Sequence, residues 1–152
     1  MDSLVTSAVA VGGTLAGASL TYLFGWLTAR RAEAVARREQ LRRDRIAAYT
    51  SFAGAITDLR QAVITLWFTH QGDADPASAQ TEADRRGATA DHARFTVRLL
   101  TEDPAVLHLV DETFAPITAI AEAPDLAALK EHEARSQTAL DTFIQAAGRH
   151  VR

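Results

Sequence analysis

The feature that most constrains this chain is a long apolar run that passes directly into a charged stretch. From residue 3 to residue 29 the only ionisable side chain is that of Tyr22. The apolar run covers residues 4–27, which is 24 residues. A helix rises 1.5 Å per residue, so about 20 residues cross a hydrocarbon core of roughly 30 Å. The sequence therefore predicts a transmembrane anchor over residues 1–29.

Two other interpretations of the apolar run are weaker. A cleaved signal peptide would begin with positive charge and have a shorter apolar core before a small-residue cleavage site. This chain begins Met-Asp-Ser, and its run ends in Trp-Leu-Thr-Ala-Arg-Arg. A buried helix of a soluble protein would be unusually long for so small a chain. Tyr22 and Trp26 also lie where the aromatic residues of a membrane interface are expected.

Positive charge follows the predicted span on one side only. The arginines of residues 30–45 are Arg30, Arg31, Arg37, Arg38, Arg42, Arg43 and Arg45. Only three acidic residues accompany them, whereas residues 46–152 carry fifteen acidic residues against nine basic ones. Arginines close to a span stay on the cytoplasmic side and contact anionic lipid head groups. We expect a single-pass protein with its N-terminus outside and the rest in the cytoplasm.

Small residues line one face of the predicted span. Gly13 and Gly17 form a G-x-x-x-G motif, and the same row of the helix continues through Thr21 to Gly25. Such a row lets a second helix approach closely and favours homo-oligomers in the membrane. Glycine and alanine are also common in spans that do not associate, so both interpretations stay open.

No helix-breaking residue separates the span from the charged stretch. Strong helix formers fill residues 30–45, and two Glu–Arg pairs, Glu33–Arg37 and Glu39–Arg43, stand in the favourable i,i+4 order. The transmembrane helix is therefore expected to continue as an Arg-rich helical stalk over residues 30–45 and to end near Gln71-Gly72. Nucleic-acid binding by these arginines is less favoured, because the stretch adjoins the bilayer and has no interleaved aromatic residues.

An apolar seam with alternating spacings of three and four begins after the stalk. Its members are Tyr49, Phe52, Ile56, Leu59, Val63 and Leu66, and His70 comes next in the series. Ala48, Ala55, Ala62 and Trp67 widen this face, which favours an antiparallel bundle over a coiled coil. Residues 46–152 are therefore expected to form a cytoplasmic helical bundle.

The remaining sequence predicts about three further helices. Pro76 can open the first, which has Phe95 and Leu99 flanking its apolar stripe. Asp103 and Pro104 suit the N-cap and first residue of the second, whose stripe is Val106, Val110, Thr113, Ile117 and Ile120. Pro116 should kink this helix or split it after Ala115. The last helix covers residues 126–149, with Leu129, Leu140, Phe143, Ile144 and Ala147 inward. The predicted fold is all-α, because no segment alternates like a strand.

The sequence offers no catalytic or metal-binding motif. There is no cysteine, and His132-Glu133 fails the H-E-x-x-H spacing because position 136 is serine. No glycine-rich phosphate loop and no G-x-S-x-G motif occur outside the predicted span. We therefore expect no enzymatic activity, no cofactor, no metal and no small-molecule substrate.

The layout as a whole resembles a known family. The stretch ARRAEAVARREQLRRDRIAAYTSFAGAITDLRQAVITLW, the later LLTEDPAV and the helical tail are similar to the KilB-type proteins of streptomycete plasmids and prophages. The bias toward arginine and alanine fits a GC-rich actinobacterial genome. The resemblance implies a membrane-associated role in the spread functions of plasmid transfer, and it brings no catalytic residues.

Three functions remain open at this point. The first is a membrane-anchored interaction or scaffold protein that self-associates and binds an unidentified cytoplasmic partner. The second is a binder of anionic lipid or nucleic acid that acts through Arg37, Arg38, Arg42, Arg43 and Arg45. The third is a small toxic membrane protein.

Overall fold

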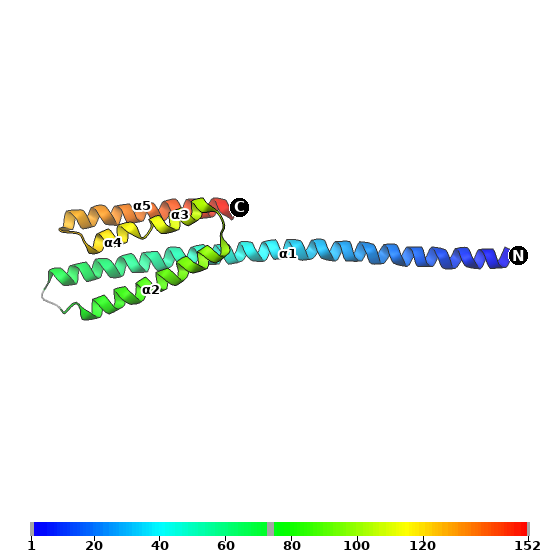
Figure 1. Cartoon of the computed structure of the whole chain (residues 1–152), viewed down its shortest axis with the longest axis horizontal. Coiled ribbons are helices and arrows are strands. Elements are labelled where there is room, and N and C mark those ends of the chain that lie inside the picture. The colour runs from blue at the N-terminus through cyan, green and yellow to red at the C-terminus, as the bar shows by residue number, and fades with distance from the viewer. Residues whose placement is uncertain (1, 73–74, 152) are drawn as a thin grey trace. The chain divides into compact units, whose positions relative to one another are not determined.

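The computed structural model describes the backbone of residues 2–72 and 75–151, and side chains from residue 30 onward except those of residues 31, 34, 73, 74 and 152. The chain divides into two compact units, residues 1–41 and 42–152. The helices are α1 (Asp2–Gln71), α2 (Ala77–Leu100), α3 (Pro104–Glu112), α4 (Ala115–Ala121) and α5 (Leu126–His150) (Figure 1). Within the described backbone every regular element is helical, as the sequence predicted.

Helix α1 passes from the apolar run through the Arg-rich stretch without interruption and ends at Gln71. The absence of a breaker explains this continuity, and Gly72 follows the last helical residue. The predicted span, with Gly13, Gly17, Thr21 and Gly25, lies outside the residues whose side chains are described. Among the described residues, no helix has both the length and the apolar character needed to cross a bilayer.

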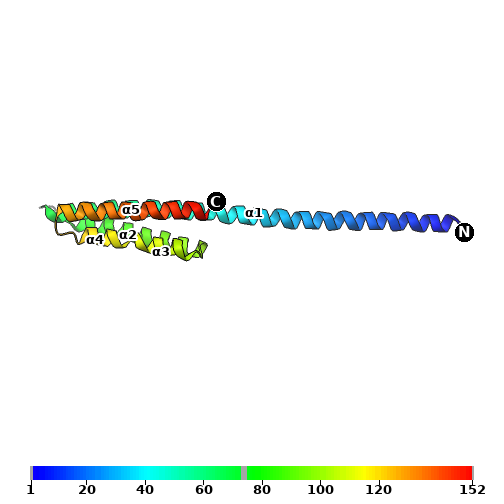
Figure 2. The same ribbon diagram turned by 90° about the horizontal axis from the view of Figure 1, so that it is seen from above.

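The second unit is a helical bundle made of two layers. Helix α1 from Arg42 onward lies with α5 in one layer, and α2 lies with α3 and α4 in the other (Figure 2). Phe52 of α1 joins the two layers, because its ring centroid lies 6.2 Å from that of Phe114, and it packs within its own layer 5.0 Å from Phe143 of α5. Phe52, Ile56 and Phe143 are fully buried.

All six seam residues of α1, from Tyr49 to Leu66, are buried, and so are Ala48, Ala55, Ala62 and Trp67. The wide apolar face therefore meets helices on more than one side, which is the arrangement of an antiparallel bundle. His70 continues the spacing but is exposed. It lies one residue before the end of α1, in a shallow hollow that Gln80 and Asp84 of α2 also line.

Four helices follow α1, where the sequence suggested about three, because the predicted helix that begins at Asp103-Pro104 is split into α3 and α4. The break falls at residues 113–114 and not after Ala115 as expected. Pro116 lacks an N–H and its ring would clash with the carbonyl of Glu112, so the α-helical ladder ends before the proline. Thr113 fills the break, and its hydroxyl donates to the carbonyl oxygen of Val110 at 2.7 Å.

One helix start follows the predicted chemistry, and a second uses the same chemistry. The carboxylate of Asp103 accepts a hydrogen bond of 2.9 Å from the N–H of Ala105, and Pro104 is the first residue of α3. Asp125 caps α5 in the same way through the N–H of Ala128 at 2.8 Å. Asp103 fixes the turn from α2 to α3 within one layer, and Asp125 fixes the turn from α4 to α5, where the chain passes to the other layer.

One inward position predicted for α5 is wrong. Leu129, Leu140, Phe143 and Ala147 are buried, but Ile144 is 48% exposed. Ile144 is turned 100° from Phe143 around the helix, which places it at the edge of the buried face. The core position one turn before Leu140 is filled by Ser136, which is fully buried.

Candidate interaction surface

Two arginines of the predicted stalk bind the bundle. Arg45 Nε donates to the carbonyl oxygen of Leu100 at 2.8 Å, and Arg42 Nε donates to that of Val151 at 2.7 Å. These carbonyls belong to the C-terminal ends of α2 and α5, where a positive charge is favourable. The compact unit accordingly begins at Arg42, four residues before the expected Ile46. Arg42 and Arg45, which the sequence assigned to lipid head groups and topology, thus also make contacts within the bundle.

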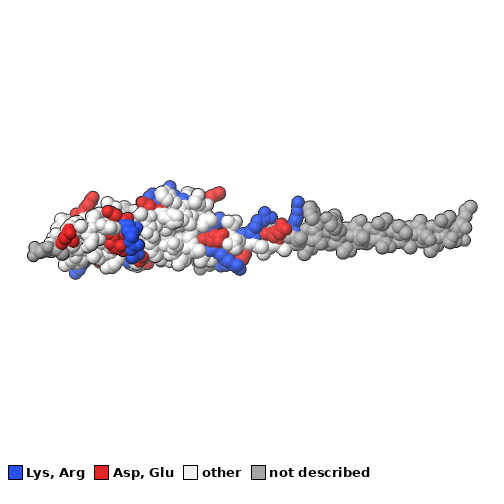
Figure 3. All heavy atoms as spheres, turned by 90° about the horizontal axis from the view of Figure 1, so that it is seen from below, with Lys and Arg blue, Asp and Glu red and all other residues white. Residues whose placement is uncertain are grey.

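The remaining described arginines of this stretch are on the surface. Arg30, Arg37, Arg38 and Arg43 are exposed, whereas the side chain of Arg31 lies outside the described residues. Arg37 lies 3.8 Å from Glu33, which is one of the two i,i+4 pairs expected from the sequence. Both signs of charge occur along this part of α1 (Figure 3).

An apolar groove of about 340 Å³ lies between α1 and α5 in the bundle, and we call it the α1–α5 groove. Its lining is Ile46, Tyr49, Thr50, Ala53, Phe143, Ile144, Ala147, Gly148 and Val151. Ile46 and Ile144 stand 39% and 48% exposed. A groove with an apolar lining and exposed isoleucines is typical of a surface that binds another protein.

A second apolar surface projects from α2. Phe95 is 60% exposed and Leu99 is 86% exposed, and the two lie one turn apart; we call them the α2 ridge. The sequence placed them beside the buried stripe, which is wrong. At 100° per residue they lie about 200° from Ala93 and Val97, which face the core, so they point outward. Helix α2 thus has apolar residues on two opposite sides.

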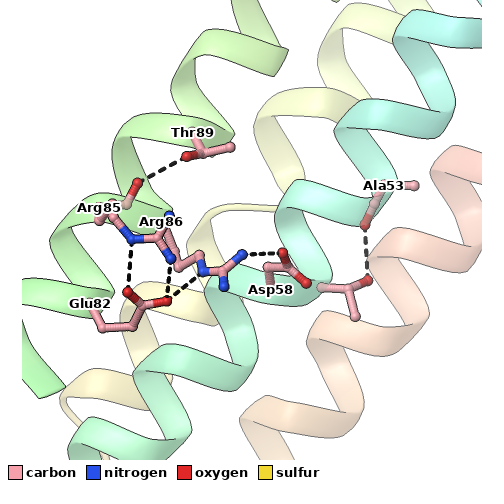
Figure 4. Close-up of polar contacts among 7 residues, drawn as sticks. Ala53, Asp58, Glu82, Arg85, Arg86 and Thr89 are labelled. Carbon is pink, nitrogen blue, oxygen red and sulfur yellow. Dashed lines mark hydrogen bonds and ion pairs between the residues drawn. The ribbon is translucent and has the colours of Figure 1, made fainter.

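A charged cluster ties α2 to α1 (Figure 4). Glu82 accepts hydrogen bonds from Arg85 Nε at 2.8 Å and from Arg86 Nε at 2.7 Å, and Arg86 also pairs with Asp58 of α1. The bonds from Arg85 and Arg86 lower the pKa of Glu82 to about 2. Two acids and two bases balance each other here, so the cluster holds helices together and offers no unbalanced charge to a ligand.

A similar cluster joins α2 to α3. Asp111 accepts bonds from Arg94 Nη2 at 2.7 Å and from Arg98 Nη2 at 2.8 Å, and the guanidinium of Arg94 lies 5.2 Å from the ring centre of Phe114. Partial burial acts to raise the pKa of Asp111, but the bonds from Arg98 and Arg94 outweigh it, so that the pKa is lowered. Asp111 is therefore a structural partner of arginines.

The described histidines do not form a metal centre. In the described part of the chain, no group of three or more histidines and carboxylates could hold a metal ion. His150 Nδ1 lies 3.4 Å from Asp103 Oδ2, and His108 lies 4.0 Å from Glu112. Ser136, which breaks the zincin spacing after His132, is buried in the core.

Sequence reasoning missed both apolar surfaces. The groove depends on how α1 and α5 pack, which periodicity does not give. The ridge had a signal, because Phe95 and Leu99 share a face of α2 that the stripe of Ala93 and Val97 does not use.

The bundle matches the model of a known protein family. The model of a family described as KilB plasmid transfer protein matches residues 46–151, which is well over half of the chain. No curated protein and no solved structure shows a significant match. The matched residues contain both the α1–α5 groove and the α2 ridge.

Proposed function

The chain belongs to the KilB plasmid transfer protein family, and we propose that it serves plasmid transfer as a membrane-anchored helical interaction protein. The observation that carries this proposal is the α1–α5 groove, an open apolar surface on the bundle that the family match covers. The described residues offer no metal cluster, and the charged clusters around Glu82 and Asp111 hold helices together. A role in binding fits this arrangement better than a catalytic one.

The membrane anchor is the sequence-based part of the proposal. Residues 4–27 supply an apolar run of sufficient length, and the arginines after it favour a cytoplasmic bundle. Flotation of the full chain with liposomes, and its resistance to alkaline extraction, test the anchor against a variant that lacks residues 1–29. A reporter fused after Arg152 tests the orientation. An extractable full chain, or an extracellular reporter, contradicts this part.

The groove is tested in cells that transfer the plasmid. Ile144→Glu places a carboxylate at the groove rim, where the side chain can still reach water, so the bundle should fold. We expect plasmid transfer to fall with this variant. Leu126→Glu is the matched control, because Leu126 is exposed to a similar degree, 45%, and does not line the groove. Equal transfer by both variants would remove the groove from the proposal.

Exposed arginines favour a second activity of the same protein, the binding of anionic lipid head groups. Arg30, Arg37, Arg38 and Arg43 are exposed, and each basic residue near a bilayer surface contributes about 1 kcal/mol. Replacing Arg37 and Arg38 by glutamine should weaken binding to phosphatidylglycerol vesicles but not to neutral ones. A salt-dependent shift of DNA that these replacements abolish would instead favour nucleic acid.

Self-association in the membrane is proposed from the small-residue row. Leucine at Gly13 and Gly17 would separate two closely packed helices. We expect the doubly substituted full chain to migrate in detergent as a smaller species than the wild type. An unchanged size would assign any association to the bundle.

A further inference from the structure

We propose that copies of this chain associate head to tail, with the α2 ridge of one copy docked in the α1–α5 groove of the next. The inference rests on the proposed function as an interaction protein, and it names one partner of the groove, a second copy. It uses surfaces of the bundle and does not depend on the small-residue row of the predicted span.

The two surfaces match in form. The groove has small residues along it, Ala53, Ala147 and Gly148, and its rim carries two isoleucines. A Cβ added to Gly148 would meet no atom within 4 Å, so this part of the groove is open. The ridge supplies two large apolar side chains one turn apart on a helix, which is the usual spacing of the anchors of a helix that binds in an apolar groove.

The charged residues at the ends of the two surfaces, Arg42 and Glu102, are opposite in sign. Arg42 lies at the Val151 end of the groove, since its Nε donates to that carbonyl oxygen. Beside the ridge, Asp91 pairs with Arg94 at 3.9 Å and Arg98 pairs with Asp111 at 2.8 Å, and exposed Glu102 comes three residues after Leu99. Opposite charges at the rim of an interface speed association and select the orientation. Glu102 at one end of the ridge therefore suits Arg42 at one end of the groove.

The groove and the ridge lie on different faces of the bundle. The groove lies between α1 and α5, which share one layer, whereas α2, which carries the ridge, lies in the other layer (Figure 2). On the face that carries α2, uncharged surface lies between groups of charged side chains (Figure 3). A contact between two different faces is heterologous, so each docked copy leaves one groove and one ridge for further copies.

Site-specific cross-linking tests the contact, because the chain contains no cysteine. One tagged full-length copy carries Leu99→Cys and a second, differently tagged copy carries Gly148→Cys. Gly148 has no positive φ and has space for the new side chain. After oxidation by copper phenanthroline in detergent or vesicles, we expect disulfide-linked heterodimers in the mixture and little product from either variant alone.

Further variants make each outcome decisive. Adding Ile144→Glu to the groove copy, or Phe95→Glu to the ridge copy, should abolish the heterodimer while circular dichroism stays helical. Leu126→Cys replaces Leu99→Cys in the matched control and should give no product with Gly148→Cys. A dominant Leu99→Cys homodimer would overturn the head-to-tail arrangement, and so would the absence of the heterodimer. Flotation of the same samples reports the membrane anchor independently, so failure of the contact is distinct from failure of the proposed function.

Discussion

Arg45 Nε donates a hydrogen bond of 2.8 Å to the carbonyl oxygen of Leu100, the last residue of α2. The bond joins residues 55 positions apart and places a positive charge at the negative end of a helix dipole. Nearby, the hydroxyl of Tyr49 lies 2.5 Å from the Oγ1 of Thr101, and both side chains are buried. These contacts fasten the turn between α2 and α3 to α1.

Arg45→Gln should destabilise the bundle. The variant loses a charge-assisted bond that is partly screened by solvent, so we expect a loss of about 1 kcal/mol of unfolding free energy. Denaturant unfolding of the full chain in detergent, followed by circular dichroism, measures it. Arg38→Gln is the control, because Arg38 is exposed and should change stability by less than about 0.5 kcal/mol. Equal effects of the two variants would mean that the Leu100 contact contributes nothing.

The elements most accessible to sequence reasoning are those set by local chemistry. Asp103-Pro104 starts α3 because a carboxylate caps N–H groups and a proline needs no donor at a helix start. The seam from Tyr49 to Leu66 is buried because its spacing puts every member on one face of α1. Both features follow from residues close together in sequence.

Features that depend on contacts between residues far apart in the sequence were harder to predict. The arginines at positions 42 and 45 look alike in sequence to those at 37 and 38, and only the folded ends of α2 and α5 distinguish them. Ile144 reads as a core residue, yet its exposure depends on which side of α5 meets α1. The α1–α5 groove is absent from any single helix, so periodicity could not predict it.

Trp67→Phe should lower the unfolding free energy by more than the change in side-chain volume alone suggests. The indole Nε1 of Trp67 donates to the carbonyl oxygen of Ala123 at 2.8 Å inside the core. Phenylalanine would leave that buried oxygen without a partner, at about 1–3 kcal/mol. The unfolding free energy measures the effect, with Phe95→Leu on the exposed ridge as the aromatic control. A change below about 0.5 kcal/mol would show that water replaces the indole as donor.

Ser136→Ala should stabilise the protein. The serine is fully buried and its hydroxyl has no hydrogen-bond partner in the described structure. Alanine removes an unsatisfied polar group and is also the better helix former, so a gain of about 1 kcal/mol is expected. Ser51→Ala, on the exposed side of α1, gives the helix-propensity part alone. A loss of stability from Ser136→Ala would reveal a partner for the hydroxyl.

The carboxylate of Glu82 should make the stability of the bundle depend on pH. Glu82 has a pKa of about 2 in the folded protein against 4.5 ordinarily, because Arg85 and Arg86 donate to its carboxylate. A depressed folded pKa contributes stability above pH 4.5, and that contribution is lost as the pH falls toward 2. Glu82→Gln should therefore lower the unfolding free energy at pH 7. It should also reduce the amount of unfolding free energy that the protein loses between pH 4.5 and pH 2, as measured by unfolding curves. In a background with Arg85→Gln and Arg86→Gln, Glu82→Gln should change little. The same acid dependence in all of these variants would mean that Glu82 does not couple folding to pH.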